Sequence, residues 1–232
     1  MKMTSQTIAK IGLTTSLAAA LALVAGGCGH PVPSASPTLS MSPAGSAGTP
    51  SCYVYAGLDT SASWRPFLGV SATLCARQAL HLDSNRDFLT LYRLDSSTRE
   101  FSNGHAPESG DQLQRVIIRE VGDVSTTRGT FPAKFWTAAA TRAESDPGNV
   151  VVEIFSDGDN DDQSAQAAAD IKAAARRLAA NPHVSSVWIF GAAPRNWATL
   201  RAEFAPLGEH FHLCSPPEMT RDRVASALSG GS

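Results

Sequence analysis

Three oxygen-bearing side chains follow the first apolar run after residue 50. In the stretch YVYAGLDTSASW, Asp59, Ser61 and Ser63 occupy every second position after a strand-like segment. Carboxylate, hydroxyl and water oxygens are the ligands that hard cations such as Mg²⁺ take in proteins. The spacing therefore predicts either an ordinary polar turn or one part of a metal site.

Two other loops carry oxygen ligands. The segment SDGDNDD, which contains Asp157, follows the β-branched run NVVVEIF. The segment STTRGTF precedes a helical pattern and contains three threonines, Thr126, Thr127 and Thr130. Thr130 is the best candidate of the three, because Gly129 comes directly before it and a helix begins shortly after it.

Strand-like and helix-like patterns alternate along the rest of the chain. Strands are expected at 52–58, 87–94, 149–156, 184–191 and 210–214, with an antiparallel piece at 98–104. Helices are expected at 67–82, 111–121, 131–144, 165–180, 194–204 and 218–228. The β-branched residues of 111–121 also leave a strand open there. The alternation predicts an α/β fold: a Rossmann-like, doubly wound, mostly parallel sheet of order 3-2-1-4-5-6, with one antiparallel edge strand and helices on both faces.

The predicted strand order brings the three loops together. In open α/β sheets, ligands bind at the carboxyl ends of the strands where the order reverses, which here are the first and fourth strands. Asp59 ends the first strand and Asp157 follows the fourth. Both loops are therefore expected at one crevice, and Thr130 is expected to join them.

The three loops together resemble the von Willebrand factor type A family with a metal-ion-dependent adhesion site. That family carries Asp-x-Ser-x-Ser after the first strand, Gly-Thr before a helix and Thr-Asp-Gly after the fourth strand. The matching residues in this chain are Asp59, Ser61 and Ser63, then Gly129 and Thr130, then Ser156, Asp157 and Gly158. Ser156 stands where the family usually has Thr. The resemblance covers nearly everything after residue 50.

The resemblance implies a site for Mg²⁺, or for Mn²⁺ or Ca²⁺, that captures an acidic residue of a protein partner. Its ligand set would be Asp59, Ser61, Ser63, Thr130 and Asp157, with the aspartates acting directly or through water. Such a domain is a binding module and not an enzyme. Two alternatives stay open: a scaffold of the same fold with a vestigial metal site, and a metal-dependent hydrolase, which lacks an evident general base.

Other metal and phosphoryl sites fit the sequence less well. In DGDNDD the glycine position of an EF-hand holds Asp162 and the closing acidic position holds Ala168, which excludes that calcium loop. The acidic residues after Asp157 are instead expected to form a solvated start to the next helix. An aspartyl phosphatase usually has a second Asp where this chain has Ser61. His210 and His212 share a strand face, where histidines without metal are more common than a zinc site.

The N-terminus predicts export and lipid attachment. Lys2 and Lys10 flank the start, an apolar run follows, and small residues precede Cys28, as in a bacterial lipobox. We expect a signal peptide at 1–27, and then a lipidated Cys28 with a disordered Pro/Ser/Ala tether at 28–50. The VWA-like domain is expected at 51–232. These features place it in the bacterial cell envelope, where it would contact the membrane through its N-terminal lipid.

Composition and cysteine usage limit the remaining possibilities. The 232 residues are 43% hydrophobic and 17% charged, which suits one folded domain with extra segments. The formal net charge is -2 and no Lys/Arg cluster is present, so a nucleic-acid partner is disfavoured. In an oxidising compartment, the disulfide to test first joins Cys52 and Cys75, which leaves Cys214 free.

Overall fold

Among residues 52–122 and 129–229, six strands form one sheet in the order β3-β2-β1-β4-β5-β6. Their bounds are β1 Cys52–Asp59, β2 Phe88–Leu94, β3 Arg99–His105, β4 Asn149–Phe155, β5 Val184–Phe190 and β6 Phe211–Cys214. The edge strand β3 runs antiparallel to β2, and all other neighbours are parallel. The predicted strand order and the antiparallel edge strand are confirmed.

The computed structural model describes residues 52–122 and 129–229. The predicted signal peptide, Cys28, the tether, Thr126 and Thr127 lie outside these ranges. No helix among the described residues is long and apolar enough to cross a membrane.

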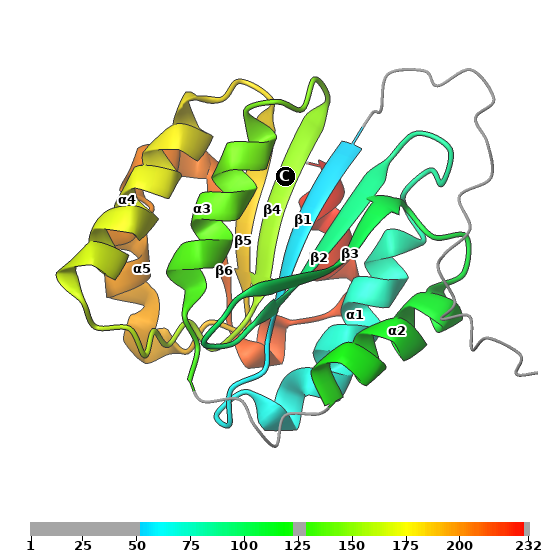
Figure 1. Cartoon of the computed structure of the whole chain (residues 1–232), viewed down its shortest axis with the longest axis horizontal. Helices are drawn as coiled ribbons and strands as arrows, with labels where there is room; N and C mark the ends of the chain where they lie inside the picture. The colour runs from blue at the N-terminus through cyan, green and yellow to red at the C-terminus, as the bar shows by residue number, and fades with distance from the viewer. Residues whose placement is uncertain (1–51, 123–128, 230–232) are drawn as a thin grey trace, which may run out of the picture. The chain divides into compact units, whose positions relative to one another are not determined.

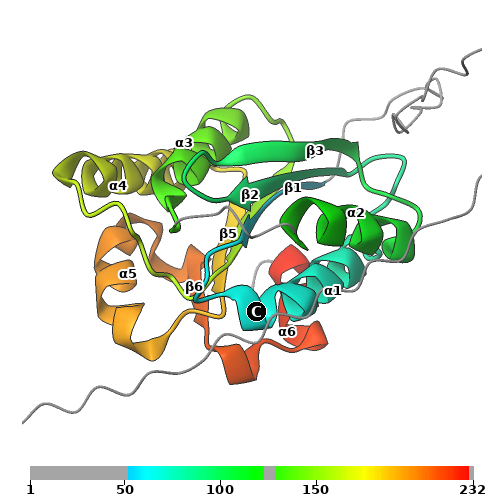
Figure 2. The same ribbon diagram turned by 60° about the horizontal axis from the view of Figure 1, so that its bottom comes forward.

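Helices cover both faces of the sheet (Figure 1). Their bounds are α1 Leu68–Ala79, α2 Gly110–Gly122, α3 Pro132–Ala143, α4 Ala165–Ala180, α5 Trp197–Glu203 and α6 Arg221–Ser226. Figure 2 shows α1, α2 and α6 together on one side of the sheet, with α3 and α4 on the other. Short 3₁₀ turns, among them η3 Pro194–Asn196 and η4 Ala205–His210, complete several connections.

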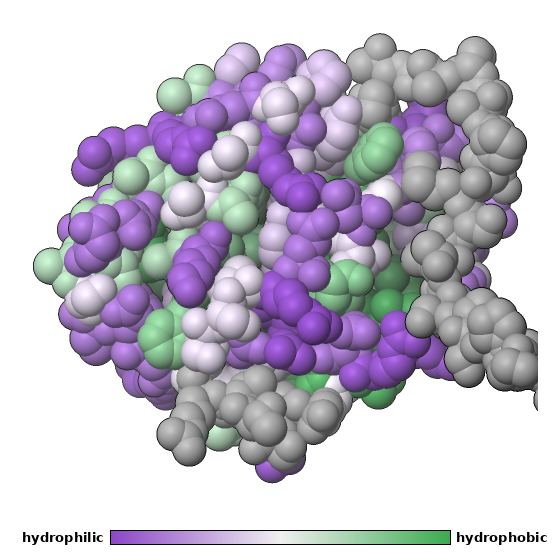
Figure 3. Space-filling model, in the orientation of Figure 1, coloured by the Kyte–Doolittle hydropathy of each residue, from purple (hydrophilic) through white to green (hydrophobic). Residues whose placement is uncertain are grey.

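The alternation of side chains along the central strands explains the two helical layers. In β1, Val54 and Leu58 join the core under α1, whereas Tyr55 joins the core under α3. In β4, Phe155 lies on the α1 side and Ile154 on the α3 side. A strand that is apolar on both faces is stable only when helices cover both. The edge strand β3 differs, because hydrophilic side chains follow its outer side (Figure 3).

The structure decides two expectations about the helices. Residues 111–121 form a helix, in which Leu113, Ile117 and Val121 are buried at four-residue spacing, so the alternative strand is wrong. The helical spacing of Phe67, Val70 and Leu74 predicts a buried face that contains Val70, but this prediction is wrong because Val70 is 48% exposed. The buried face of α1 contains Leu68, Ala72 and Cys75 instead.

The cysteines within the described residues are buried free thiols. The pairing expected between Cys52 and Cys75 is not formed in this structure. Burial raises the pKa of the Cys52 thiol to about 12 and that of Cys75 well above its usual value, so both thiols remain protonated at neutral pH. Trp64, Trp136 and Trp188 pack in the core, since each is at most 2% exposed.

Candidate metal centre

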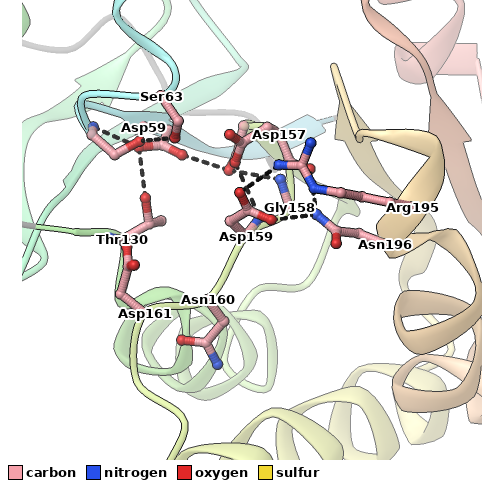
Figure 4. A network of polar contacts seen from close by, with 12 residues as sticks. Asp59, Ser63, Thr130, Asp157, Gly158, Asp159, Asn160, Asp161, Arg195 and Asn196 are labelled. Atoms are coloured by element: carbon pink, nitrogen blue, oxygen red, sulfur yellow. Dashed lines mark hydrogen bonds and ion pairs between the residues drawn. The ribbon is translucent and has the colours of Figure 1, made fainter.

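One buried carboxylate connects the three predicted loops (Figure 4). Asp59, the last residue of β1, is 0% exposed. Its Oδ1 accepts hydrogen bonds from the Ser61 amide at 2.7 Å and from the Thr130 hydroxyl at 2.9 Å. Its Oδ2 accepts a hydrogen bond from the Ser156 hydroxyl at 2.6 Å. Residues up to 97 positions apart in the chain therefore meet at one side chain.

The first loop is fixed to the sheet on one side and open on the other. The backbone amide and the hydroxyl of Thr60 both donate to the Leu94 carbonyl, at 3.1 and 3.0 Å, which ties the end of β1 to β2. The hydroxyls of Ser61 and Ser63 are 3.1 Å apart. Ser61 is buried and Ser63 is exposed, so the pair runs from the protein interior to the surface.

The second loop is held by Asp161. The Thr130 amide donates to Asp161 Oδ2 at 2.6 Å, and the Asp161 amide donates to the Thr130 carbonyl at 3.0 Å. Gly129 adopts a φ of +74°, and a Cβ there would lie 2.7 Å from Asp161 Oδ2. Glycine is therefore required for the close approach that presents the Thr130 hydroxyl to Asp59.

The third loop begins directly after β4. The Ser156 hydroxyl accepts a hydrogen bond from the Gly158 amide at 3.1 Å, so the loop folds back over this side chain. The Asp157 carbonyl accepts hydrogen bonds from the Ala193 amide at 2.8 Å and from Asn196 Nδ2 at 3.0 Å. Asp157 is 9% exposed, and these two bonds to the β5–α5 connection fix its backbone.

The electrostatics of the centre suit a hard divalent cation. Burial raises the pKa of Asp59, and the hydrogen bonds from Ser156, Ser61 and Thr130 oppose that rise. Within the described part of the chain, neither Asp59 nor Asp157 forms an ion pair with Lys, Arg or His. A carboxylate with no cationic partner, surrounded by hydroxyl oxygens, fits Mg²⁺ by the chemistry of its donors.

The acidic residues after Asp157 differ from the prediction. They were expected to form an acidic start to the following helix, but α4 begins at Ala165 with no acidic residue in its first turn. Ser164 caps the helix by accepting a hydrogen bond from the Ala167 amide at 3.1 Å. The acidic residues lie before this cap, where Asp161 holds the Thr130 loop and Asp162 accepts a hydrogen bond from the Ser164 amide.

The two histidines lie on different elements. His210 lies at the end of η4 and not on the strand, and its Nδ1 is 3.0 Å from the Ser185 carbonyl. His212 stacks on Trp188 with ring centroids 4.2 Å apart. Within residues 52–122 and 129–229, no three His, Cys, Asp or Glu side chains lie together so as to hold a metal ion. The candidate centre depends on hydroxyls as well as on Asp59 and Asp157.

Four residues outside the predicted ligand set shape the centre. The sequence did indicate Ser156, because it replaces the threonine of the resembled motif. Its hydroxyl donates a hydrogen bond to Asp59. Asp161 had only its place in an acidic run. Nothing in the sequence indicated Arg195 and Asn196, because they come from the β5–α5 connection and contact the third loop only in the folded chain.

A polar groove lies beside the third loop. Its volume is about 410 Å³, and its lining includes Gly158, Asp159 and the residues that precede α4. The opposite wall comes from α5 and the turn before it, with Asn196 and Glu203 among its residues. The groove is lined by Gly158 and Asp159, which directly follow Asp157, so a molecule bound at the centre would lie next to the groove.

Solved structures show which fold this is, whereas no protein-family profile and no curated protein sequence matches the chain. The D319A mutant of the PilB minor pilin from Streptococcus sanguinis has a TM-score of 0.56 at 9% identity, covering 78% of this chain and 60% of that one. A von Willebrand factor type A protein from Catenulispora acidiphila has a TM-score of 0.53 at 14% identity, covering 78% and 43%.

A third similar structure contains a metal. It is proximal thread matrix protein 1 from the mussel byssus with a zinc-occupied MIDAS motif, with a TM-score of 0.51 at 8% identity, covering 79% of this chain and 47% of that one. This chain spans less than two thirds of the length of each of these three proteins. Identities this low establish the fold alone, and the described domain has a von Willebrand factor type A-like, Rossmann-like fold.

Proposed function

We propose that this domain binds a divalent cation, Mg²⁺ by preference, and uses it to capture an acidic residue of a protein partner. The observation that carries the proposal is the contact of Asp59 with all three loops, through the Ser61 amide and the hydroxyls of Thr130 and Ser156. The residues that would hold the cation are Asp59, Ser61, Ser63, Thr130 and Asp157.

The chemistry of these residues explains why a partner carboxylate would be attracted. Three of the five proposed ligands are neutral hydroxyls, so the protein supplies few negative charges. A bound divalent cation supplies a positive charge that a carboxylate can neutralise. The exposed position of Ser63 supports access from solvent, because the centre reaches the surface there.

We propose binding and not catalysis as the role of the centre. The oxygens of Asp59 accept three hydrogen bonds, an arrangement that suits a fixed carboxylate better than a mobile general base. The groove beside the third loop supports the same role, since a protein segment bound at the centre could extend along it.

We further propose that Cys28 carries a lipid and that residues 28–50 tether the domain outside the cytoplasm, in the bacterial cell envelope. The small residues before Cys28 support this proposal. Two similar structures are a minor pilin and a pilus adhesin, SpaC from Lactobacillus rhamnosus GG, which is consistent with a binding role at a cell surface. The cation would then act on a partner in the same compartment.

Affinity capture from the native cell envelope tests the proposed function. The full chain should retain a partner in Mg²⁺ and release it when a chelator is added. Asp157→Asn should lose the partner, whereas the matched control Glu108→Gln, which alters an exposed acid on the loop before α2, should retain it. Equal capture with and without chelator would contradict the proposal and favour the scaffold with a vestigial site.

A further inference from the structure

We infer that Arg195 and Asn196 hold the Asp159 carboxylate away from the candidate metal centre, and that they thereby set which divalent cation the centre prefers. The inference rests on the proposed function. It concerns a carboxylate two residues from Asp157, which is near enough in sequence to join the same ligand set.

Both oxygens of Asp159 accept a hydrogen bond from the β5–α5 connection. Arg195 donates to Asp159 Oδ2 at 2.6 Å, and Asn196 Nδ2 donates to Oδ1 at 2.7 Å. In Figure 4 the side chains of Arg195 and Asn196 contact Asp159 from the side away from Asp59. The two donors come from the turn η3, which begins after β5. The Asp159 carboxylate is therefore held toward the β5–α5 connection.

The backbone turns at Gly158, between Asp157 and Asp159. In an extended strand, residues two positions apart point to the same face. Gly158 has a φ of +77°, in the left-handed region, which breaks this alternation between Asp157 and Asp159. A Cβ at Gly158 would lie 2.9 Å from Leu200 Cδ1, so the side chain of Leu200 in α5 would have to shift.

The described residues contain no place where Asp59, Asp157 and Asp159 converge as three possible ligands. This matters because the number of carboxylates separates the cations. Mg²⁺ is bound through one or two carboxylates and keeps several waters, whereas Ca²⁺ accepts six to eight oxygens, including bidentate carboxylates. A third carboxylate would therefore favour Ca²⁺ and would neutralise more of the charge that attracts a partner.

Cation titration of four full-length proteins tests the inference: wild type, Arg195→Ala, the double variant Arg195→Ala/Asp159→Asn, and Arg176→Ala. Arg195→Ala should raise the affinity for Ca²⁺ relative to Mg²⁺ by about tenfold, because Asp159 Oδ2 is released. The double variant should return the ratio to that of wild type. Arg176→Ala removes an exposed arginine from α4, away from the centre, and should change nothing.

Unfolding temperature under chelator is the second readout. Arg195 is 65% exposed in its ion pair, so Arg195→Ala should unfold close to wild type without metal. If the ratio of Ca²⁺ affinity to Mg²⁺ affinity is unchanged in Arg195→Ala, the inference is overturned. Cation binding by the wild-type protein would still support the proposed function in that case. A ratio that shifts but is not restored by Asp159→Asn would also overturn it. If wild type binds neither cation, the proposed function fails first, and the inference fails with it.

Discussion

Asp59 is a buried carboxylate whose charge is costly for the fold and would serve the proposed cation site. Burial disfavours its charged form, which raises its pKa, and the donors around it compensate only in part. A positive charge at the same place would relieve this cost directly. The residue therefore has a reason to be charged and buried that its neighbours in the core do not have.

The substitution Asp59→Asn tests this view of the residue. The amide oxygen can still accept from the Ser61 amide, and the Ser156 hydroxyl can turn to accept from the new NH₂ group. We expect Mg²⁺ affinity to fall by about tenfold or more, because a charged ligand is lost. We expect the unfolding temperature under chelator to stay at or above that of wild type, since the buried charge is removed.

Calorimetric titration and thermal unfolding in chelator measure the two quantities. Glu108→Gln is the control for loss of one negative charge at the surface. If Asp59→Asn unfolds far below wild type in chelator, the carboxylate holds the loops together for stability, and its place in a metal site loses its main support.

At the scale of helices and strands, a second buried acid, Glu153, lies in the middle of β4. Glu153 is 0% exposed, and Gln78 Nε2 of α1 donates to its Oε2 at 2.8 Å and to the Val224 carbonyl of α6 at 3.0 Å. Its Oε1 has no hydrogen-bond partner among the residues that the structure describes. Burial raises its pKa to about 8, and the nearby groups Cys52 and Cys75 are protonated thiols. The protonated side chain of Glu153 therefore lies where β4, α1 and α6 meet.

The stability of the domain should fall as pH rises from about 4.5 to about 8. Below that range Glu153 is protonated whether the chain is folded or unfolded. Within it the folded chain keeps the proton and the unfolded chain releases it, which costs up to about 1.4 kcal/mol per pH unit. Above about pH 8 the loss of stability due to Glu153 does not increase further. Glu153→Gln should flatten this slope in urea unfolding curves, and an unchanged slope would contradict the assignment.

Much of the element pattern could be predicted because it is local. The β-branched run NVVVEIF indicates a strand, and the Ala-rich segment that forms α4 indicates a helix. In both, a few consecutive residues are enough. The helix α2 was ambiguous, since its Val and Ile residues also suit a strand, and only packing of Leu113 and Ile117 against the core decides it.

The candidate site could be predicted in part for the same reason. Asp59, Ser61 and Ser63 form a local motif, and the strand order places Thr130 and Asp157 near them. Arg195 and Asn196 could not be predicted, because nothing in their own segment indicates that η3 packs against the loop after β4. Asp161 was misassigned because an acidic residue before a helix has several possible partners.

At the scale of the whole molecule, the N-terminal segment and the domain have separate proposed roles, attachment and binding. Cys28→Ser tests the first role. We expect the variant to lose acyl labelling in its native host and to leave the membrane fraction or to stay unprocessed, because the thiol is the proposed site of lipid attachment. Cys52→Ser, which alters a buried thiol in the domain, is the control. Acyl labelling equal to wild type in Cys28→Ser would contradict the lipoprotein proposal.

The central claim is that three loops build one cation site, and Mg²⁺ titration of a double-mutant cycle tests it most directly. Ser61→Ala removes a hydroxyl from the first loop, and Thr130→Val removes one from the second while keeping the side-chain shape. If both oxygens hold one ion, each single variant should lose most of the binding and the double variant little more. Wild-type affinity in either single variant, or losses that simply add in the double variant, would contradict the claim.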